Sequence, residues 1–206
     1  MSRRAKGARV TSTDPVTLTR REQLKAQRRQ QLLDAGARLI ADRGFLGMRL
    51  DDLGAAVGIS GPAVYRHFPN KEALLVELLV GVSQRLLDGG KAVVARTAGP
   101  AEALDGLVDF HLDFALGDPE LIRIQDRDLE NVPAAARREL RRTQRQYVEI
   151  WVTVLRDLHP GLPEETARVQ AHAAFGLINS TPHSATTATA ARARPILRRM
   201  ALSALG

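Results

Sequence analysis

The chain has 206 residues, of which 44% are hydrophobic and only 4% aromatic, with no cysteine and a formal net charge of +7. Disulfides, thiolate nucleophiles and cysteine-bound zinc are therefore excluded. The composition favours helices over strands rich in β-branched and aromatic residues, and we expect an all-α protein.

The excess charge lies in the first third of the chain. Residues 1–75 hold 14 Lys and Arg against seven Asp and Glu, whereas residues 76–206 hold 16 of each. A basic segment joined to a larger neutral one suggests a polyanionic partner such as nucleic acid. A basic end that serves only solubility would give the same count, and that alternative stays open.

Export and membrane signals are absent from the pattern. Arg3-Arg4 is not followed by the roughly 7 to 15 apolar residues of a signal segment. No apolar run approaches the roughly 20 residues that a membrane span requires. We expect a cytoplasmic protein without a membrane partner.

Helical periodicity dominates from residue 21 onward. Residues 1–20 lack it and predict a disordered basic tail, which either is solvated or reaches a DNA minor groove. Apolar spacings of three, four and seven predict helices at about 21–43, 50–57, 61–68, 71–95, 101–117, 118–131 and 133–159. A small-residue helix after Pro163 and a last helix around Ile196 make about nine in all.

Residues 50–68 have the pattern of a helix-turn-helix, two short helices joined by Gly58-Ile59-Ser60. On the second of these, Val64 and Phe68 are four apart and face inward, which leaves a basic and polar face outward. Such a face binds phosphates and base edges. The expected DNA contacts are Arg49, Ser60, Gly61, Pro62, Ala63, Tyr65, Arg66, His67 and Lys71.

The stretch "LLDAGARLIADRGFLGMRLDDLGAAVGISGPAVYRHFPNKEALL" resembles the N-terminal domain of the TetR family of bacterial transcriptional regulators. The family pattern ends, as here, in Tyr-x-x-Phe, a turn and a Lys-Glu pair, and the match covers about residues 24–80. One departure is Met48-Arg49, where the family usually has Thr or Ser opening the second helix. This loses a hydroxyl cap, and Arg49 is expected to replace the phosphate contact.

The resemblance implies a DNA-binding domain at 21–75 and a helical ligand-binding and dimerisation domain at 76–206. It also implies pairing of two subunits through the last two long helices. The sequence agrees with this, because small residues on one helix permit close approach and the last helix offers an apolar surface to pack against them. The expected interface residues are Ala167, Ala171, Ala174, Ile178, Ile196, Leu197 and Met200, although an intramolecular core would use the same pattern.

A ligand cavity is the second implication of the resemblance. The stretch "QDRDLENVP" is similar to actinobacterial members that respond to lipid-derived or acyl-CoA ligands, with Arg123 or Arg127 placed to meet an anionic head. Plain core packing is the alternative for the aromatic residues. The candidate ligand residues are Phe110, Phe114, Arg123, Arg127, Tyr147, Trp151, Phe175, Asn179 and His183.

Enzymatic and metal-binding alternatives have little support. Ser180 with His183 lacks the strand and G-x-S-x-G elbow of a hydrolase. His111-x-Asp113 and the scattered histidines show no second ligand spacing, so no metal, cofactor or catalytic residue is expected.

The sequence therefore predicts a homodimeric, ligand-responsive regulator, a repressor as is usual in the family, that binds a pseudo-palindromic operator and leaves it when a small apolar effector binds. A non-specific architectural DNA-binding protein is the alternative.

Overall fold

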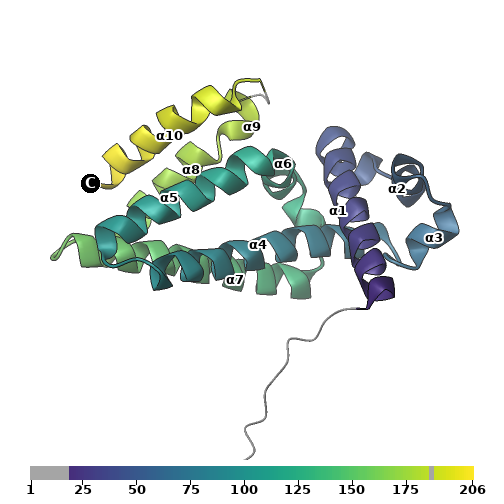
Figure 1. Cartoon of the computed structure of the whole chain (residues 1–206), viewed down its shortest axis with the longest axis horizontal. Coiled ribbons are helices and arrows are strands. Elements are labelled where there is room, and N and C mark those ends of the chain that lie inside the picture. Colours follow the sequence, from purple (N-terminus) through teal and green to yellow (C-terminus); the bar gives the residue numbers. More distant parts are fainter. Residues whose placement is uncertain (1–18, 186–187) are drawn as a thin grey trace, which may run out of the picture.

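The computed structural model describes residues 19–185 and 188–206, and in these ranges it contains ten α-helices, one 3-10 turn and no strand. Figure 1 shows an elongated molecule with α1, α2 and α3 at one end and the chain's C-terminus at the other. The elements are α1 (Arg20–Gly47), α2 (Leu50–Val57), α3 (Gly61–Tyr65), α4 (Lys71–Ala95), α5 (Pro100–Gly117), α6 (Pro119–Asp128), η1 (Leu129–Asn131), α7 (Ala134–Leu158), α8 (Glu164–Ile178), α9 (Thr181–Ser184) and α10 (Ala190–Leu205).

The expected all-α class is confirmed, with two differences in detail. The additional helix is α9, a single turn around Pro182, where the sequence predicted only a break. Helix α3 ends at Tyr65 rather than near residue 68, although Phe68 still donates its N–H to the carbonyl of Val64. The expected basic tail lies almost entirely outside the described residues. No helix in the described ranges is long and apolar enough to cross a membrane.

Helix α1 begins at a capping box. The Thr19 hydroxyl accepts from the N–H of Glu22, and the Glu22 carboxylate accepts from the N–H of Thr19, which satisfies donors at the helix start. Near its other end Gly44 has φ +77° and ψ 156°, a conformation that L side chains rarely adopt. The helical path therefore breaks at Gly44, directly after the predicted helix of residues 21–43.

Helix α4 joins the two ends of the molecule (Figure 1). Its Leu74, Leu75, Leu78, Leu79 and Val82 belong to one hydrophobic cluster, with α1, α2 and α3, whereas its Leu87 belongs to a second cluster with α5, α7, α8 and α10. The proposed domain boundary at residue 75 falls inside this helix. Leu121 and Ile124 of α6 also pack into the first cluster, so α6 is shared between the two ends.

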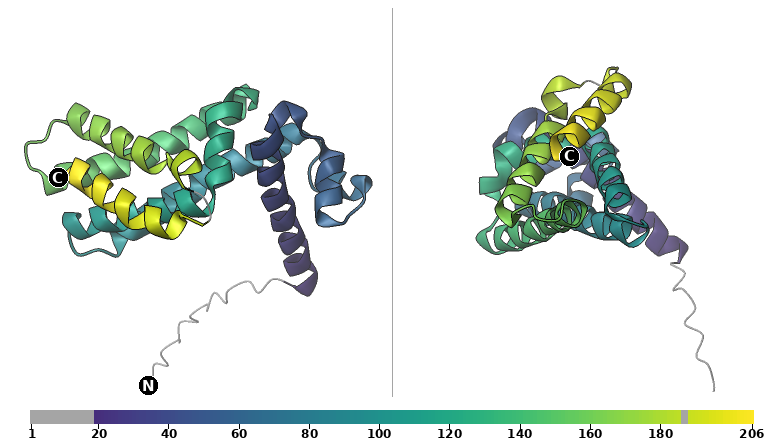
Figure 2. Two further views of the ribbon diagram at one scale, coloured as in Figure 1. Left: turned by 90° about the horizontal axis from the view of Figure 1, so that it is seen from above. Right: turned by 90° about the vertical axis from the view of Figure 1, so that its left-hand side faces the viewer.

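The second cluster corrects part of the expected dimer interface. Ala167, Ala171, Ala174 and Ile178 have no exposed surface, because they pack on α7 and α10 of the same chain, and Leu197 is 7% exposed. The four residues of α8 have no surface left for a partner, and Leu197 has very little. The intramolecular alternative therefore holds for them. Figure 2 shows α10 lying along the outside of the bundle, where Ile196 and Met200 are each 46% exposed.

Candidate nucleic-acid interface and internal cavity

The turn between α2 and α3 depends on Gly58. Gly58 adopts the left-handed conformation, with φ 70° and ψ 36°, and its N–H bonds back to the end of α2. The next residue, Ile59, donates its N–H to the carbonyl of Gly54 at 3.0 Å. Helix α2 thus ends sharply, and Ser60 starts α3 on a different axis, as in a helix-turn-helix.

The two faces of α3 differ as the sequence predicted. Val64 and Phe68 are buried, at 0% and 1% exposure, in the cluster formed with α1, α2 and α4. Tyr65 is 50% exposed, and Arg66 is exposed beside it. The remaining residues of the expected DNA-contact set are also at the surface. Arg49, Ser60 and Pro62 are exposed, and Gly61, Ala63, His67 and Lys71 are half-buried.

Arg29 fixes α3 to the rest of this end. Its guanidinium pairs with the carboxylate of Glu77 on α4 and donates to the carbonyl of His67 at 2.9 Å. It also lies 4.6 Å from the centre of the Phe68 ring, a cation–π arrangement. One cation of α1 therefore holds the end of α3 against α4, and the outward face of α3 is presented by a braced scaffold.

Lys71 has a different geometry from the one expected. Its ammonium donates to the carbonyls of Phe45, at 3.1 Å, and Leu46, at 3.3 Å, and lies 4.6 Å from the centre of the Phe45 ring. These carbonyls belong to the last turn of α1, which lacks intrahelical donors. We expected Lys71 to be free for the DNA backbone. In the structure two of its N–H groups close the end of α1, and contact of Lys71 with the DNA backbone stays a prediction.

His67 lies among cations of α1. Burial lowers its pKa from the ordinary value, and the nearby charges of Arg29 and Lys25 lower it further. A bound phosphate would act in the opposite direction, because a negative charge stabilises the imidazolium. His67 is thus placed where an anion would be favourable.

An internal cavity of about 220 Å³ lies in the helical bundle. Each of α4, α5, α6, α7 and α8 contributes to its wall. The lining residues are Ser83, Leu86, His111, Phe114, Ile122, Gln125, Asp126, Gln144, Tyr147, Val148, His172, Phe175 and Asn179. Apolar rings with a few converging polar groups are typical of a small-molecule site.

A buried polar chain crosses this cavity. His111 Nδ1 lies 3.2 Å from the hydroxyl of Tyr147, and His111 Nε2 lies 3.1 Å from Asn179 Oδ1. Burial lowers the pKa of His111 to about 4, so the ring is neutral at pH 7 and carries one proton. With the Asn179 oxygen as acceptor, Nε2–H donates to Asn179 and the Tyr147 hydroxyl donates to Nδ1.

Two family models match the chain. "Bacterial regulatory proteins, tetR family" matches residues 32–78, which contain the helix-turn-helix, and "Tetracyclin repressor-like, C-terminal domain" matches residues 97–183, which contain most of the cavity wall. The chain belongs to the TetR family. The family resemblance inferred from residues 24–80 is confirmed, and it extends to the bundle.

Individual TetR-family proteins show how far the similarity reaches. The HTH-type transcriptional repressor KstR2 of Rhodococcus jostii is 28% identical over 132 residues, which cover 64% of this chain and 65% of that protein. The matched part is thus just under two thirds of the relative. The structure of ketosteroid transcriptional regulator KstR2 of Mycobacterium tuberculosis has a TM-score of 0.74 at 22% identity, with 87% and 93% of the two chains covered. The structure of AibR with isovaleryl coenzyme A and operator DNA has a TM-score of 0.64 at 21% identity, covering 76% and 86%.

The cavity brings together four of the nine ligand residues expected for this TetR-family chain, namely Phe114, Tyr147, Phe175 and Asn179. Trp151 is fully buried behind the wall, with its ring 4.9 Å from that of Phe175. The other expected residues do not line the cavity; these are Phe110, Arg123, Arg127 and His183. Sequence reasoning missed His111, which it had weighed only as a metal ligand, and Asp126.

The two arginines expected at an anionic head bind carbonyls instead. Arg123 donates to the carbonyl of Pro182 at 3.0 Å. Arg127 donates to the carbonyls of Ile40 and Ala41 on α1, the latter at 3.2 Å. The expectation that either guanidinium marks the mouth of a ligand tunnel is therefore corrected. Among the described residues, no group of three or more His, Asp or Glu is placed to hold a metal ion.

Arg127 is part of a clamp between α6 and the break in α1. The neighbouring Asp128 is 4% exposed, and its carboxylate accepts from the N–H of Phe45 at 3.2 Å and from Arg127 Nε at 3.1 Å. Asp128 supplies an acceptor for the N–H that follows Gly44, and Arg127 supplies donors for the carbonyls of Ile40 and Ala41 that precede it. The C-terminal end of α6 thus holds both sides of the Gly44 kink.

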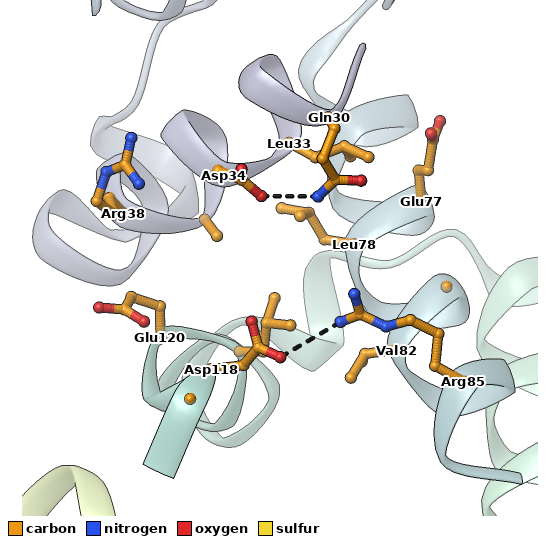
Figure 3. Close-up of a pocket in the computed structure, with 14 residues that line it drawn as sticks. Gln30, Leu33, Asp34, Arg38, Glu77, Leu78, Val82, Arg85, Asp118 and Glu120 are labelled. Atoms are coloured by element: carbon orange, nitrogen blue, oxygen red, sulfur yellow. Dashed lines mark hydrogen bonds and ion pairs between the residues drawn. The ribbon is translucent and has the colours of Figure 1, made fainter. Parts of the chain in front are cut away.

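A wider groove of about 620 Å³ lies between α1, α4 and the start of α6. Figure 3 shows Asp34 and Arg38 of α1 facing Arg85 of α4 and Glu120 of α6 across this space. Arg85 reaches over it to Asp118, with 3.5 Å between Nη2 and Oδ2. Helix α6 is therefore clamped to α1 at its C-terminal end, by Arg127 and Asp128, and borders an open groove at its N-terminal end.

Proposed function

We propose that the chain is a homodimeric transcriptional regulator, a repressor, that binds a pseudo-palindromic DNA operator and is released when a small molecule enters the internal cavity. The observation that carries the proposal is the braced helix-turn-helix, with Val64 and Phe68 inward and Tyr65 and Arg66 outward. Family membership, the repressor named among the relatives, and the structural neighbour solved with operator DNA and an acyl-CoA support it.

DNA binding is divided between two kinds of contact in this proposal. Tyr65, His67 and Arg49 hold phosphates, because a hydroxyl, an imidazole and a guanidinium are suited to phosphate oxygens. Ala63 and Arg66 face the base edges, where a methyl group meets thymine and a guanidinium meets guanine. Lys71 contributes by keeping the end of α1 in place.

Dimerisation uses the outer faces of α8 and α10. The buried alanines of α8 are excluded, and the exposed apolar residues on the two helices are Val169, Ile196 and Met200. Such side chains on adjacent helices offer a self-complementary patch for two-fold pairing. A dimer would place two copies of α3 in successive major grooves, which lie about 34 to 36 Å apart.

Effector binding reaches the DNA end through α6 in this proposal. Ile122, Gln125 and Asp126 line the cavity, and the next two residues form the clamp on α1. A ligand that displaces α6 would therefore displace the α1 end that Lys71 also holds. Almost complete release requires about 5.5 kcal/mol of difference between the ligand's affinities for the two states.

The test is selection from a pool of random duplexes at about 0.15 M salt, followed by sequencing. An enriched inverted repeat is the expected result, and it supplies the probe for ligand release. Retention of duplexes without enrichment would refute the proposal and favour the alternative, a non-specific architectural DNA-binding protein.

A further inference from the structure

We propose that the internal cavity takes a compact organic cation, such as a ring-bearing ammonium compound, rather than an anionic acyl-CoA. The inference rests on the proposed function, because it names the ligand class of the same cavity. It follows from the charge of the wall, the placement of its rings and its size.

The wall has no positive side chain to meet an anion. None of its thirteen residues is Lys or Arg, and its single carboxylate is Asp126 on α6. Asp126 is exposed, so its carboxylate lies at the solvent side of the cavity. In the described part of the chain it makes neither a hydrogen bond nor an ion pair, and its electrostatic neighbour is His183. A carboxylate or phosphate ligand would meet this carboxylate and find no Lys or Arg in the wall. An ammonium group would meet an available counter-charge.

Aromatic rings lie where a cation would be stabilised. Phe114, Tyr147 and Phe175 line the same cavity, with the Tyr147 and Phe175 rings 5.6 Å apart and 22° from parallel. The face of an aromatic ring attracts a cation within about 6 Å of its centre, and the attraction increases when the cation is desolvated. Rings and one carboxylate in the same wall suit a ring-bearing ammonium group.

The buried histidine does not oppose a cation. Burial lowers the pKa of His111 to about 4, so the ring is uncharged at pH 7. Its two nitrogens are occupied by Tyr147 and Asn179, which keeps the polar chain internally satisfied. Gln125 and Gln144 add amide oxygens that can accept from an N–H of the ligand.

The volume restricts the ligand further. About 220 Å³ is below the roughly 300 to 1,000 Å³ of pockets that hold drug-sized molecules. A nucleotide-bearing thioester would have to extend out of this partly open space, whereas a single ring with a small ammonium head fits inside it. The chemistry of the wall thus favours a smaller ligand of opposite charge to an acyl-CoA.

The test is calorimetric titration of the full chain, without DNA, with three probes of similar size. These are benzyltrimethylammonium, the neutral benzyl alcohol and the anionic phenylacetate, with isovaleryl coenzyme A as a fourth. The expected result is binding of the ammonium compound at millimolar Kd or better, about tenfold tighter than benzyl alcohol, with no binding of phenylacetate. Tighter binding of phenylacetate or of isovaleryl coenzyme A would overturn the inference, as would no heat from the ammonium compound.

A matched pair of variants locates the site. Asp126→Asn should weaken binding of the ammonium compound about tenfold and leave benzyl alcohol unchanged. Glu120→Gln is the control, because it removes a carboxylate from the same helix on the side that faces the groove of Figure 3. Equal affinities in the two variants, each with an unchanged melting temperature, would refute the assignment.

The two proposals can fail separately. An enriched operator together with no ammonium binding would leave the regulator intact and remove the ligand class. Ammonium binding that depends on Asp126, together with no enriched operator, would keep the ligand class and remove the operator.

Discussion

The buried His111 makes stability depend on pH in a defined window. Its pKa is lowered to about 4 in the folded chain, because burial disfavours the charged ring, whereas an unfolded histidine titrates near 6.5. Between these values the unfolded state binds more protons than the folded state. The free energy of unfolding therefore rises with pH across this window. The contribution of His111 reaches its full value above about pH 6.5.

The magnitude follows from the two pKa values. One unit corresponds to about 1.4 kcal/mol, so the full difference is about 3 kcal/mol, and about 2 kcal/mol of it is lost between pH 7 and pH 5. Other groups also titrate in this range, including the surface carboxylates. Their contributions cancel when the chain is compared with a variant that lacks only the imidazole.

The assay is urea unfolding at pH 7 and pH 5 of the wild-type chain and of His111→Gln, whose amide can still bond to a neighbour. The wild type should lose about 2 kcal/mol more than the variant on going to pH 5. The variant is expected to be less stable at pH 7, because it disrupts the chain to Tyr147 and Asn179. Equal losses in the two proteins would show that His111 is not buried in its neutral form, and would refute the reasoning.

Five further variants concern the DNA end, the clamp and the surface of α10. Arg49→Ala should weaken binding to all duplexes alike and reduce the salt slope of log K by about one, measured by DNA titration at several salt concentrations. Arg66→Ala should relax the preference at one base and cost about 1–3 kcal/mol of binding free energy to the preferred operator, measured by titration with operator variants. Phe68→Ala should lower the free energy of unfolding by about 3–5 kcal/mol in urea, because its ring is fully buried. Asp128→Asn should cost about 1–3 kcal/mol in the same assay and reduce the effect of ligand on DNA affinity. Ile196→Asp should leave the melt of the monomer unchanged and lower the dimer mass in sedimentation.

The helix-turn-helix was largely predictable because its signals are local. Val64 and Phe68 are four residues apart on one short helix, so periodicity alone assigns them to the inside. The glycine at position 58 stands where the chain must turn with a left-handed conformation. Both inferences need only neighbours in the sequence, and both agree with the structure.

The errors arose where the partner lies far along the chain. The small residues of α8, such as Ala171, indicate that one face is closely packed, but the pattern is the same whether the mate is α10 of this chain or another subunit. Arg127 was assigned to an anionic ligand because guanidinium groups bind anions. Its partners are backbone carbonyls of Ile40 and Ala41, and no sequence pattern marks a carbonyl 86 or 87 residues away.

The clamp also bears on which helix transmits the ligand signal. Helix α4 runs from Lys71 through both hydrophobic clusters, so tilting it would disturb leucines packed at 0–7% exposure along its length. Helix α6 has only ten residues and buries three apolar side chains, Leu121, Ile122 and Ile124, whereas α4 buries six. The first turn of α6 borders the open groove, and its later residues line the cavity and hold α1. Since close-packed interiors resist displacement, motion of α6 costs less than motion of α4. Asp128→Asn should therefore uncouple ligand from DNA even though it lies outside both binding surfaces, whereas full retention of coupling in that variant would return the role to α4.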